Sequence, residues 1–213
     1  MPARGKDGRY HHGDLRAALI ETAVEVIGER GVRGFSMAEA SRRLGVAVSA
    51  PYAHFADRDD LLAAVAVRAC EVFYRGMVRE ISRSQEPAER LAAIARCYVR
   101  FAGFNRPLFE VLFVAGIDKR DHPEVEAAEE PLNTTLLGCV RAVAGEDPSS
   151  VDDLATAAEA AAHGHAMLLI DGDFGDGDAA VERAAERAAA ATLALIEGRR
   201  MLSRPAGAKK PLQ

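Results

Sequence analysis

The sequence is poor in the residue types that mark disulfide-bonded, metal-bound or membrane-spanning proteins. Its three cysteines, Cys70, Cys97 and Cys139, are odd in number and widely spaced, which argues against a disulfide framework and a CxxC metal site. The longest run that is apolar except for Thr192, Ala188–Ile196, is about half the ~18 residues that a membrane span needs. The polar N-terminus lacks the apolar stretch of a signal peptide. We therefore expect a reducing, cytoplasmic location, no membrane partner and no metal or other cofactor.

Aromatic side chains are also scarce. Tryptophan is absent and aromatic residues make up 6% of the chain, whereas hydrophobic residues make up 49%. A chain of 213 residues is long enough to bury a core in one large domain or two small ones. Its apolar residues recur at steps of three and four, the period of an amphipathic helix, and no strand pattern or internal repeat stands out. We therefore predict an all-α protein.

An apolar stripe near the N-terminus predicts a first helix, with Asp14 as its N-cap and Gly31 as its end. The stripe consists of Leu15, Ala18, Leu19, Thr22, Ala23, Val26 and Ile27. Ser36 and Glu39 have the spacing of a capping box, which predicts the start of a short second helix. That helix is expected to end at Gly45, because glycine accepts the left-handed turn that stops a helix.

The stretch after this turn predicts a third helix that begins near Ala47. Pro51 falls in its first turn, where a proline removes at most one intrahelical hydrogen bond. Asp57 and Asp60 have the spacing of a cap for a fourth helix, Arg58 to about Ile81. A short capped helix, a glycine turn and a second helix, packed on a first amphipathic helix, are typical of a helix-turn-helix DNA-binding unit.

In such a unit the N-terminal end of the second helix enters the major groove of DNA. Small apolar side chains there can meet thymine methyl groups, and polar ones can reach phosphates. The candidates for contacts with base edges are Val48, Ser49 and Ala50. The candidates for phosphate contacts are Tyr52, His54 and Arg58. The alternative for Tyr52 and His54 is that they pack against neighbouring helices.

The net charge of -5 is unusual for a nucleic-acid binder, but the acidic excess lies after residue 60. Residues 1–60 hold nine basic and nine acidic residues. Within residues 30–54 a single acid, Glu39, stands against Arg30, Arg33, Arg42 and Arg43. The N-terminal tail adds Arg4, Lys6 and Arg9, which form either a solvated tail or an arm for the minor groove. A locally basic surface is therefore compatible with an acidic chain.

A break at Ser82–Pro87 precedes a second group of predicted helices. Its larger apolar residues form either a plain core or the lining of a small-molecule cavity between helices. The candidate pocket residues are Tyr98, Phe101, Phe104, Phe109, Phe113, His163 and Met167. His163 and His165 differ by two positions and so face different sides of a helix, which argues against one shared metal. Residues 203–213 are expected to form a disordered tail.

The acidic segment Asp171–Asp178 does not match an EF-hand loop, which needs an oxygen ligand at position five and glycine at position six. We expect a turn there, with Asp176 or Asp178 as the N-cap of the last helix.

Small-residue stripes mark the last two predicted helices, at about 151–170 and 178–202. The first stripe consists of Leu154, Ala158, Ala161, Ala162, His165, Leu168 and Leu169. The second consists of Val181, Ala184, Ala185, Ala188, Thr192, Leu195 and Ile196. Small residues let helices approach closely, so these stripes predict a homodimer in which two hairpins form a four-helix bundle. A dimer also suits DNA reading, since two units can read half-sites ~34 Å apart or a multiple of that distance.

Two stretches resemble the DNA-binding domain of the tetracycline-repressor (TetR) family. They are LIETAVEVIGERG at Leu19–Gly31 and FSMAEASRRLGVAVSAPYAHFADRDDLL at Phe35–Leu62. YHHGDLR at the start of the chain and SAPYAHFADRD resemble one subgroup, of the YHHGxLR type, and HGHAMLLIDG at His163–Gly172 resembles its C-terminal domain.

The resemblance implies a helix-turn-helix domain at 10–62, with its motif at 36–55, and a helical ligand-binding and dimerisation domain at 63–202. It places the recognition turn at Ala47–Tyr52 and phosphate contacts at Ser36, Tyr52, His54 and Arg58. The family implies a homodimeric repressor, not an enzyme, that leaves a pseudo-palindromic double-stranded operator when a small-molecule effector binds. Two departures are Arg58 in place of the usual lysine, and Ala47 in place of a capping serine or threonine, which costs ~1 kcal/mol.

Two other interpretations stay open. A regulator of the same fold can activate transcription or bind DNA without any ligand. A helical enzyme using His163 or His165 with a carboxylate is the more remote alternative, because no nucleophile–base spacing or metal motif supports it.

Overall fold

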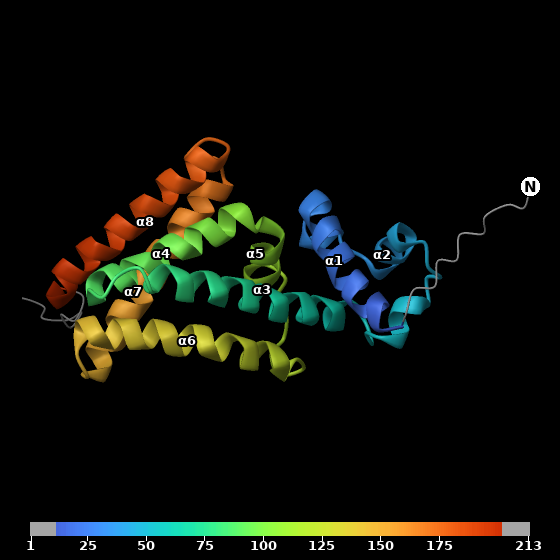
Figure 1. Cartoon of the computed structure of the whole chain (residues 1–213), viewed down its shortest axis with the longest axis horizontal. Coiled ribbons are helices and arrows are strands. Elements are labelled where there is room, and N and C mark those ends of the chain that lie inside the picture. The colour runs from blue at the N-terminus through green and yellow to red at the C-terminus, as the bar shows by residue number, and fades with distance from the viewer. Residues whose placement is uncertain (1–11, 202–213) are drawn as a thin grey trace, which may run out of the picture. The chain divides into compact units, whose positions relative to one another are not determined.

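The computed structural model describes residues 12–201, which form helices joined by loops (Figure 1). The α-helices are α1 (His12–Arg30), α2 (Met37–Leu44), α3 (Arg58–Ile81), α4 (Pro87–Phe104), α5 (Arg106–Phe113), α6 (Pro123–Ala144), α7 (Pro148–Ile170) and α8 (Asp178–Gly198). Short 3-10 helices occur at Val32–Gly34, Ala50–Ala53 and Arg199–Met201. No strand occurs in residues 12–201, so the predicted all-α fold is confirmed. None of the described helices is both long enough and apolar enough to cross a bilayer.

Contacts divide the chain into two compact units. The first contains Met1–Ala69 and Pro107–Glu126, and the second contains Cys70–Arg106 and Ala127–Gln213. The first unit thus contains a segment from later in the chain. The predicted functional domains, 10–62 and 63–202, are each a single continuous segment. The predicted basic arm and the predicted C-terminal tail lie outside the described residues.

The later segment joins the first unit through close contacts with α1 and the loop after it. A Cβ atom on Gly28 would lie 3.2 Å from the Cγ of Pro107, so the small residue allows the approach. The main-chain N–H of Val32 donates a hydrogen bond of 3.3 Å to the carboxylate of Glu110. The N-terminal sequence alone carries no sign of these partners, because they lie 78 positions or more away.

Local signals explain how α2 begins and ends. The Ser36 hydroxyl accepts a hydrogen bond of 3.3 Å from the N–H of Glu39, as predicted for a capping residue. Gly45 has φ 67° and ψ 28°, and its N–H reaches the carbonyls of Arg42 and Ser41. α2 then packs on α1 around an aliphatic core. Its fully buried members include Leu19, Ala23, Val26, Ile27, Ala40, Leu61 and Leu62.

Two predicted helix caps are wrong. α1 begins at His12, so Asp14 lies inside its first turn instead of preceding it. The N-cap of α8 is Gly177, with φ 76°, and not Asp176 or Asp178. Glycine takes this conformation without strain, so the turn ends on a residue that offers no capping side chain.

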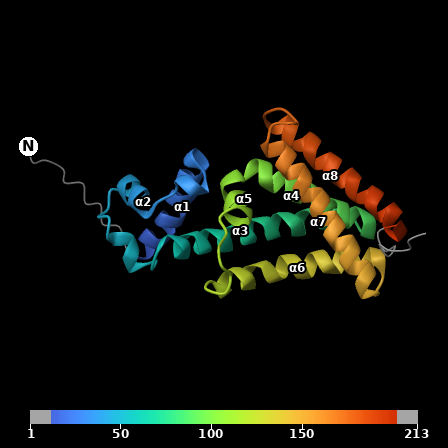
Figure 2. The ribbon, with the colours of Figure 1, turned by 180° about the vertical axis from the view of Figure 1, so that it is seen from behind.

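In the second unit, α4, α7 and α8 pack against one another (Figures 1 and 2). Gly103 on α4 makes part of this contact possible, since a Cβ atom there would lie 2.6 Å from a methyl group of Val181 on α8. Salt bridges line the edge of the same contact. Arg96 pairs with Glu186 at 2.7 Å, and Arg100 pairs with Glu182 at 2.6 Å.

Candidate functional site

The segment Gly45–Phe55, here called the reading turn, differs from the predicted α-helix. The N–H of Ala50 donates to the Ala47 carbonyl at 2.9 Å, and that of Tyr52 donates to the Ser49 carbonyl at 3.2 Å. These bonds join residues three apart and make Ala50–Ala53 a 3-10 helix. The prediction of an α-helix from about Ala47 is therefore wrong. Pro51 gives the reason, because it has no N–H with which to reach the Ala47 carbonyl as an α-helix requires.

The tip of the reading turn is exposed while its base is buried. Val48 and Tyr52 are 61% and 54% exposed. Ala47 and Ser49 are exposed as well, and Ala50 is half-buried. Pro51 and Phe55 are buried beneath the turn. The guanidinium of Arg16 on α1 covers the Phe55 ring at 5.1 Å from its centroid. The tip is thus free for a partner without any loss of core packing.

The predicted phosphate contacts have different surroundings. Tyr52 projects from the tip, and Ser36 is exposed although its hydroxyl already accepts the bond from Glu39. His54 is half-buried, and its Nε2 is buried without a hydrogen-bond partner among the described residues. Tyr52 and Ser36 are thus exposed, whereas the Nε2 of His54 is not.

Arg58 holds the first turn of α3 to the loop before α2. Its guanidinium donates hydrogen bonds of 2.7 Å to the Val32 carbonyl and 3.3 Å to the Phe35 carbonyl. It also pairs with Asp59 at 3.0 Å. These bonds position the helix that follows the reading turn. They also occupy several of the guanidinium N–H groups of Arg58 predicted to bind phosphate.

The start of α3 is fixed by the predicted pair of aspartates. The N–H of Asp60 donates to Asp57 at 2.9 Å, and the N–H of Ala56 donates to Asp60 at 2.8 Å. This reciprocal pattern confirms the predicted cap. These hydrogen bonds fix the chain between the end of the reading turn and the start of α3.

Three arginines of the predicted basic surface share one carboxylate. Glu39 lies 3.2 Å from Arg30, 2.8 Å from Arg42 and 3.2 Å from Arg43. Hydrogen bonds from Arg42 and Arg43 lower the pKa of Glu39 to about 2. Arg43 also pairs with Glu29. Arg33 is exposed and has no ion pair among the described residues. The surface keeps an excess of positive charge, since four arginines face two glutamates.

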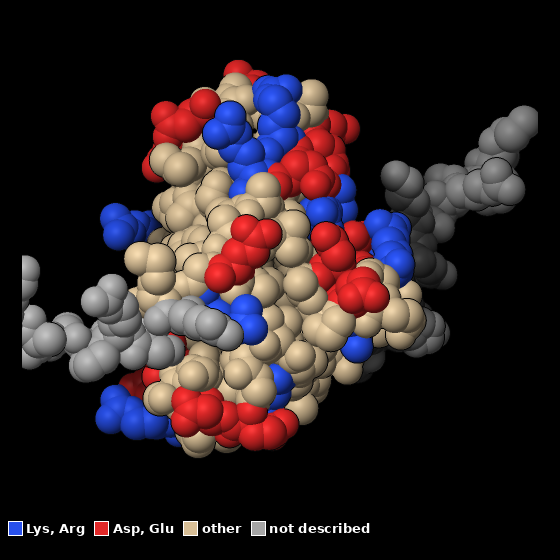
Figure 3. All heavy atoms as spheres, turned by 90° about the vertical axis from the view of Figure 1, so that its left-hand side faces the viewer, with Lys and Arg blue, Asp and Glu red and all other residues tan. Residues whose placement is uncertain are grey.

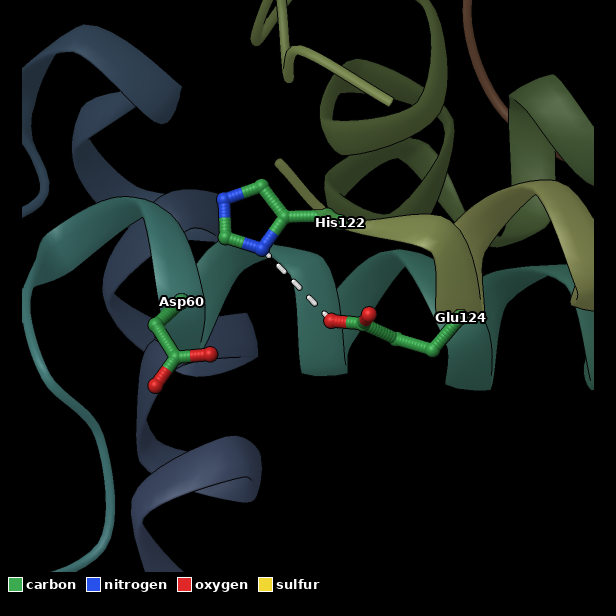
Figure 4. A group of neighbouring side chains, drawn as sticks. All are labelled: Asp60, His122 and Glu124. Carbon is green, nitrogen blue, oxygen red and sulfur yellow. Dashed lines mark ion pairs between the residues drawn. The ribbon is translucent and has the colours of Figure 1, made fainter. Parts of the chain in front are cut away.

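Asp60, His122 and Glu124 form a cluster that the sequence did not predict (Figure 4). One donor atom from each lies within 4.8 Å of the other two, and His122 Nδ1 is 3.5 Å from Glu124. A histidine nitrogen and two carboxylate oxygens are suitable ligands for a divalent cation. The helix cap at Asp60 and the pairing of His122 with Glu124 account for the same arrangement. The cluster therefore carries no metal assignment.

The seven predicted pocket residues separate into distinct groups. The Tyr98 hydroxyl and His163 Nδ1 are 2.8 Å apart and join α4 to α7. Phe101 stacks on Phe73 at 5.0 Å, and with Phe104 it lines an open cleft of about 690 Å³ between α3 and α4. Met167 is half-buried on α7. The remaining pair, Phe109 and Phe113, lies in the first compact unit with ring centroids 4.7 Å apart.

His163 and His165 point away from each other, as their spacing predicts. His165 Nδ1 donates to the Ala161 carbonyl at 2.7 Å, whereas His163 faces Tyr98. The acidic segment between α7 and α8 is a turn, and Arg183 donates to the Phe174 carbonyl there at 2.7 Å.

A second cleft, of about 440 Å³, lies between α3, α4 and α6. Its polar lining residues include Tyr74, Arg90, Thr134 and Thr135. Sequence patterns offer no reason to group them, because they come from three helices and none belongs to a motif.

The predicted residues of the dimer seam serve mostly to pack this chain on itself. Those that are buried within it are Leu154, Ala158, Ala162, Val181, Ala184, Ala185, Ala188, Thr192 and Ile196. These nine residues lie where α4, α7 and α8 pack on one another, so their assignment to the dimer seam is wrong. Ala161, His165, Leu168, Leu169 and Leu195 are not buried, and for them the dimer seam stays a prediction. Helical periodicity identifies a buried face, but it does not tell whether the covering helix belongs to the same chain.

Two family profiles match the chain. One, described as bacterial regulatory proteins of the tetR family, matches residues 19–65. The other, described as the tetracyclin repressor-like C-terminal domain, matches residues 91–192. No curated protein sequence matches the chain.

Solved structures share the fold. A protein of unknown function from Rhodococcus sp. RHA1 is 27% identical, with a TM-score of 0.67 over 88% of this chain and 98% of the other. The TetR-family regulator PfmR from Thermus thermophilus is 17% identical, with a TM-score of 0.65 over 83% and 97%. FadR from Bacillus subtilis, solved with stearoyl-CoA, is 17% identical, with a TM-score of 0.65 over 84% and 96%. Since profiles of one family match both its N-terminal and its C-terminal parts, the chain belongs to the TetR family of transcriptional regulators.

Proposed function

We propose that the chain is a homodimeric repressor that binds a pseudo-palindromic operator through the reading turn and leaves it when a small-molecule effector binds. The observation that carries this proposal is the exposed tip with Val48 and Tyr52, set on a buried base of Pro51 and Phe55. Val48 and Tyr52 are exposed together at this tip, and exposed apolar groups that lie together form a candidate contact surface for a partner. The start of the chain, YHHGDLR, further supports membership of the YHHGxLR subgroup.

In this proposal the tip enters the major groove. Val48, Ser49 and Ala50 meet base edges, with the Val48 methyl groups suited to thymine. Tyr52 and Ser36 donate hydroxyl hydrogen bonds to phosphates, and His54 is the third candidate for a phosphate contact. Arg58 acts mainly by positioning, because its guanidinium is bound to two carbonyls.

Two copies are needed, because one short element contacts too few base pairs for specificity. We infer pairing through the outward faces of α7 and α8, which hold the exposed Leu168 of the predicted stripe but not the stripe residues that are buried. Exposed small residues there include Ala160 on α7 and Ala190 and Ala194 on α8. Figure 3 shows surface without charged residues between groups of acidic and basic residues on the side of the molecule that lies at the left of Figure 1. Such surfaces allow two helix pairs to approach closely.

The effector acts by favouring one of two conformations. In one of them, the spacing of the two reading turns does not match that of the operator half-sites. A ligand in the second compact unit that binds this state more tightly lowers the affinity for the operator. The clefts on α3 and α4 support such a role, since the helix that carries the reading turn also contributes to their walls. FadR, solved with stearoyl-CoA, shows that this fold can hold a small molecule.

A gel-shift titration on the DNA upstream of the chain's own gene tests the proposal. Tyr52→Phe removes one phosphate hydrogen bond per subunit and should weaken binding about tenfold or more. Tyr52→Ala should weaken it further. Val114→Ala, at a side chain that is 49% exposed in the same unit, is the matched control and should leave binding unchanged. Equal operator affinity for the wild type and Tyr52→Ala would contradict the proposal.

A further inference from the structure

The cleft between α3, α4 and α6 has a mixed lining that suits a small amphipathic ligand. Val78, Ile81 and Ala142 give it an apolar wall, and Tyr74, Thr134 and Thr135 add hydroxyl groups. Its volume of about 440 Å³ lies toward the lower end of the ~300–1,000 Å³ typical of small-molecule sites. All lining residues belong to the second compact unit, so the cleft is formed within a single unit.

Arg90 is the one charged residue in this lining, and its charge is not neutralised. The side chain has no hydrogen bond and no ion pair among the described residues, and its Nε is buried without a partner. An arginine stays protonated in proteins, and a buried N–H without an acceptor is costly. The two Nη atoms are not buried in this way, so they remain available to an acceptor that enters the cleft.

The other arginines of α4 that have been described make the contrast clear. Arg96 binds the carboxylate of Glu186 at 2.7 Å, and Arg100 binds Glu182 at 2.6 Å. Arg90 lies on the same helix, is half-buried, and faces no carboxylate. The positive charge of Arg90 acts on Cys139 in the cleft wall. Burial raises the pKa of Cys139, and the charge of Arg90 lowers it.

We propose that this cleft binds a small organic acid, whose carboxylate pairs with Arg90 and whose hydrocarbon part lies along Val78, Ile81 and Ala142. A guanidinium can bind a carboxylate through two parallel hydrogen bonds. One unpaired guanidinium matches the single charge of a carboxylate, whereas a phosphate dianion would leave charge unmatched in a lining without lysine. Thr134, Thr135 and Tyr74 supply further hydrogen bonds. This inference rests on the proposed function, in which such an acid is the effector.

Thermal-shift and calorimetric titrations of the purified full chain test the site with matched probes. Hexanoate, octanoate and benzoate are compared with hexanamide, octanamide and benzamide, which keep the shape and lack the charge. At least one acid should bind to saturation and raise the melting temperature, and its amide should bind ~10- to 100-fold more weakly. Equal binding of acids and amides, or no binding by any acid, overturns the proposal.

Arg90→Gln should reduce the affinity for the acid by ~10- to 100-fold. It should leave the ligand-free protein as stable as the wild type or more so, because an unpaired charge is removed. Arg141→Gln, at an exposed arginine of α6 outside the cleft lining, is the control and should bind the acid normally. A lower melting temperature of ligand-free Arg90→Gln with unchanged affinity for the acid would assign Arg90 a structural role and overturn the proposal.

Operator binding without acid is measured separately, so the two proposals can fail independently. If Tyr52→Ala does not weaken operator binding, DNA binding by the reading turn is refuted, and the result of the acid titration still stands. Acid binding that requires Arg90 supports the site, and release of the operator by the same acid in the wild type but not in Arg90→Gln identifies it as the effector site.

Discussion

The reading turn and the α4–α7–α8 contact use apolar side chains in opposite ways. In the reading turn Val48 and Tyr52 are largely exposed, and the packing is left to Pro51 and Phe55. In the helical contact most residues of the stripes are buried, with Leu154 1% and Thr192 0% exposed, although Leu168 is 45% exposed. In the reading turn the side chains that pack in the core and the side chains that are exposed are therefore different residues. On α7 and α8 the chain itself covers most of a stripe that the sequence offers to a partner.

The largest expected effect is the difference in unfolding free energy between two truncations, one in each region. Leu154→Ala should lower the free energy of unfolding by ~2–5 kcal/mol, because it leaves a cavity between helices. Val48→Ala should change it by no more than ~0.5 kcal/mol, yet weaken operator binding. Urea denaturation at one fixed protein concentration measures the first quantity, since dimerisation makes stability depend on concentration. Comparable destabilisation by both variants would remove the distinction between the regions.

Arg58→Gln should have an intermediate effect and sharpen the distinction further. The substitution removes hydrogen bonds to the Val32 and Phe35 carbonyls, which should cost ~1–3 kcal/mol of unfolding free energy. Operator affinity should fall with it, because the first turn of α3 is released. Arg33→Gln, at an exposed arginine without an ion pair among the described residues, should leave stability unchanged. Weaker DNA binding by Arg58→Gln at wild-type stability would show that Arg58 serves DNA alone.

Features with short-range causes were predictable from the sequence. The caps at Ser36 and Asp57, and the glycine stop at Gly45, each depend on partners within four residues, and the structure contains all three. The sequence predicts the position of the reading turn but not its helix type. A proline in the first turn of a helix is expected to be harmless, whereas in so short an element the missing N–H shifts the pattern to bonds between residues three apart.

Features that depend on distant partners were not predictable. The carbonyls that bind Arg58 lie 23 and 26 positions before it. The cluster of Asp60, His122 and Glu124 and the isolation of Arg90 follow from which helices become neighbours. A single sequence shows the residue types, and only the tertiary arrangement decides which charges find partners.

The smallest expected effect concerns the acid stability of the arginine cluster around Glu39. The pKa of Glu39, about 2, lies below the ordinary 4.5, so the ionised carboxylate stabilises the fold at neutral pH. That contribution should fade as the pH drops from 4.5 toward 2. Glu39→Gln, which cannot ionise, should show a weaker fall in urea midpoint over this range, whereas the exposed control Glu71→Gln should follow the wild type. The difference should be small, because water and salt screen surface pairs. Identical acid sensitivity in Glu39→Gln and the wild type would mean that these arginines contribute charge for DNA and nothing to the fold.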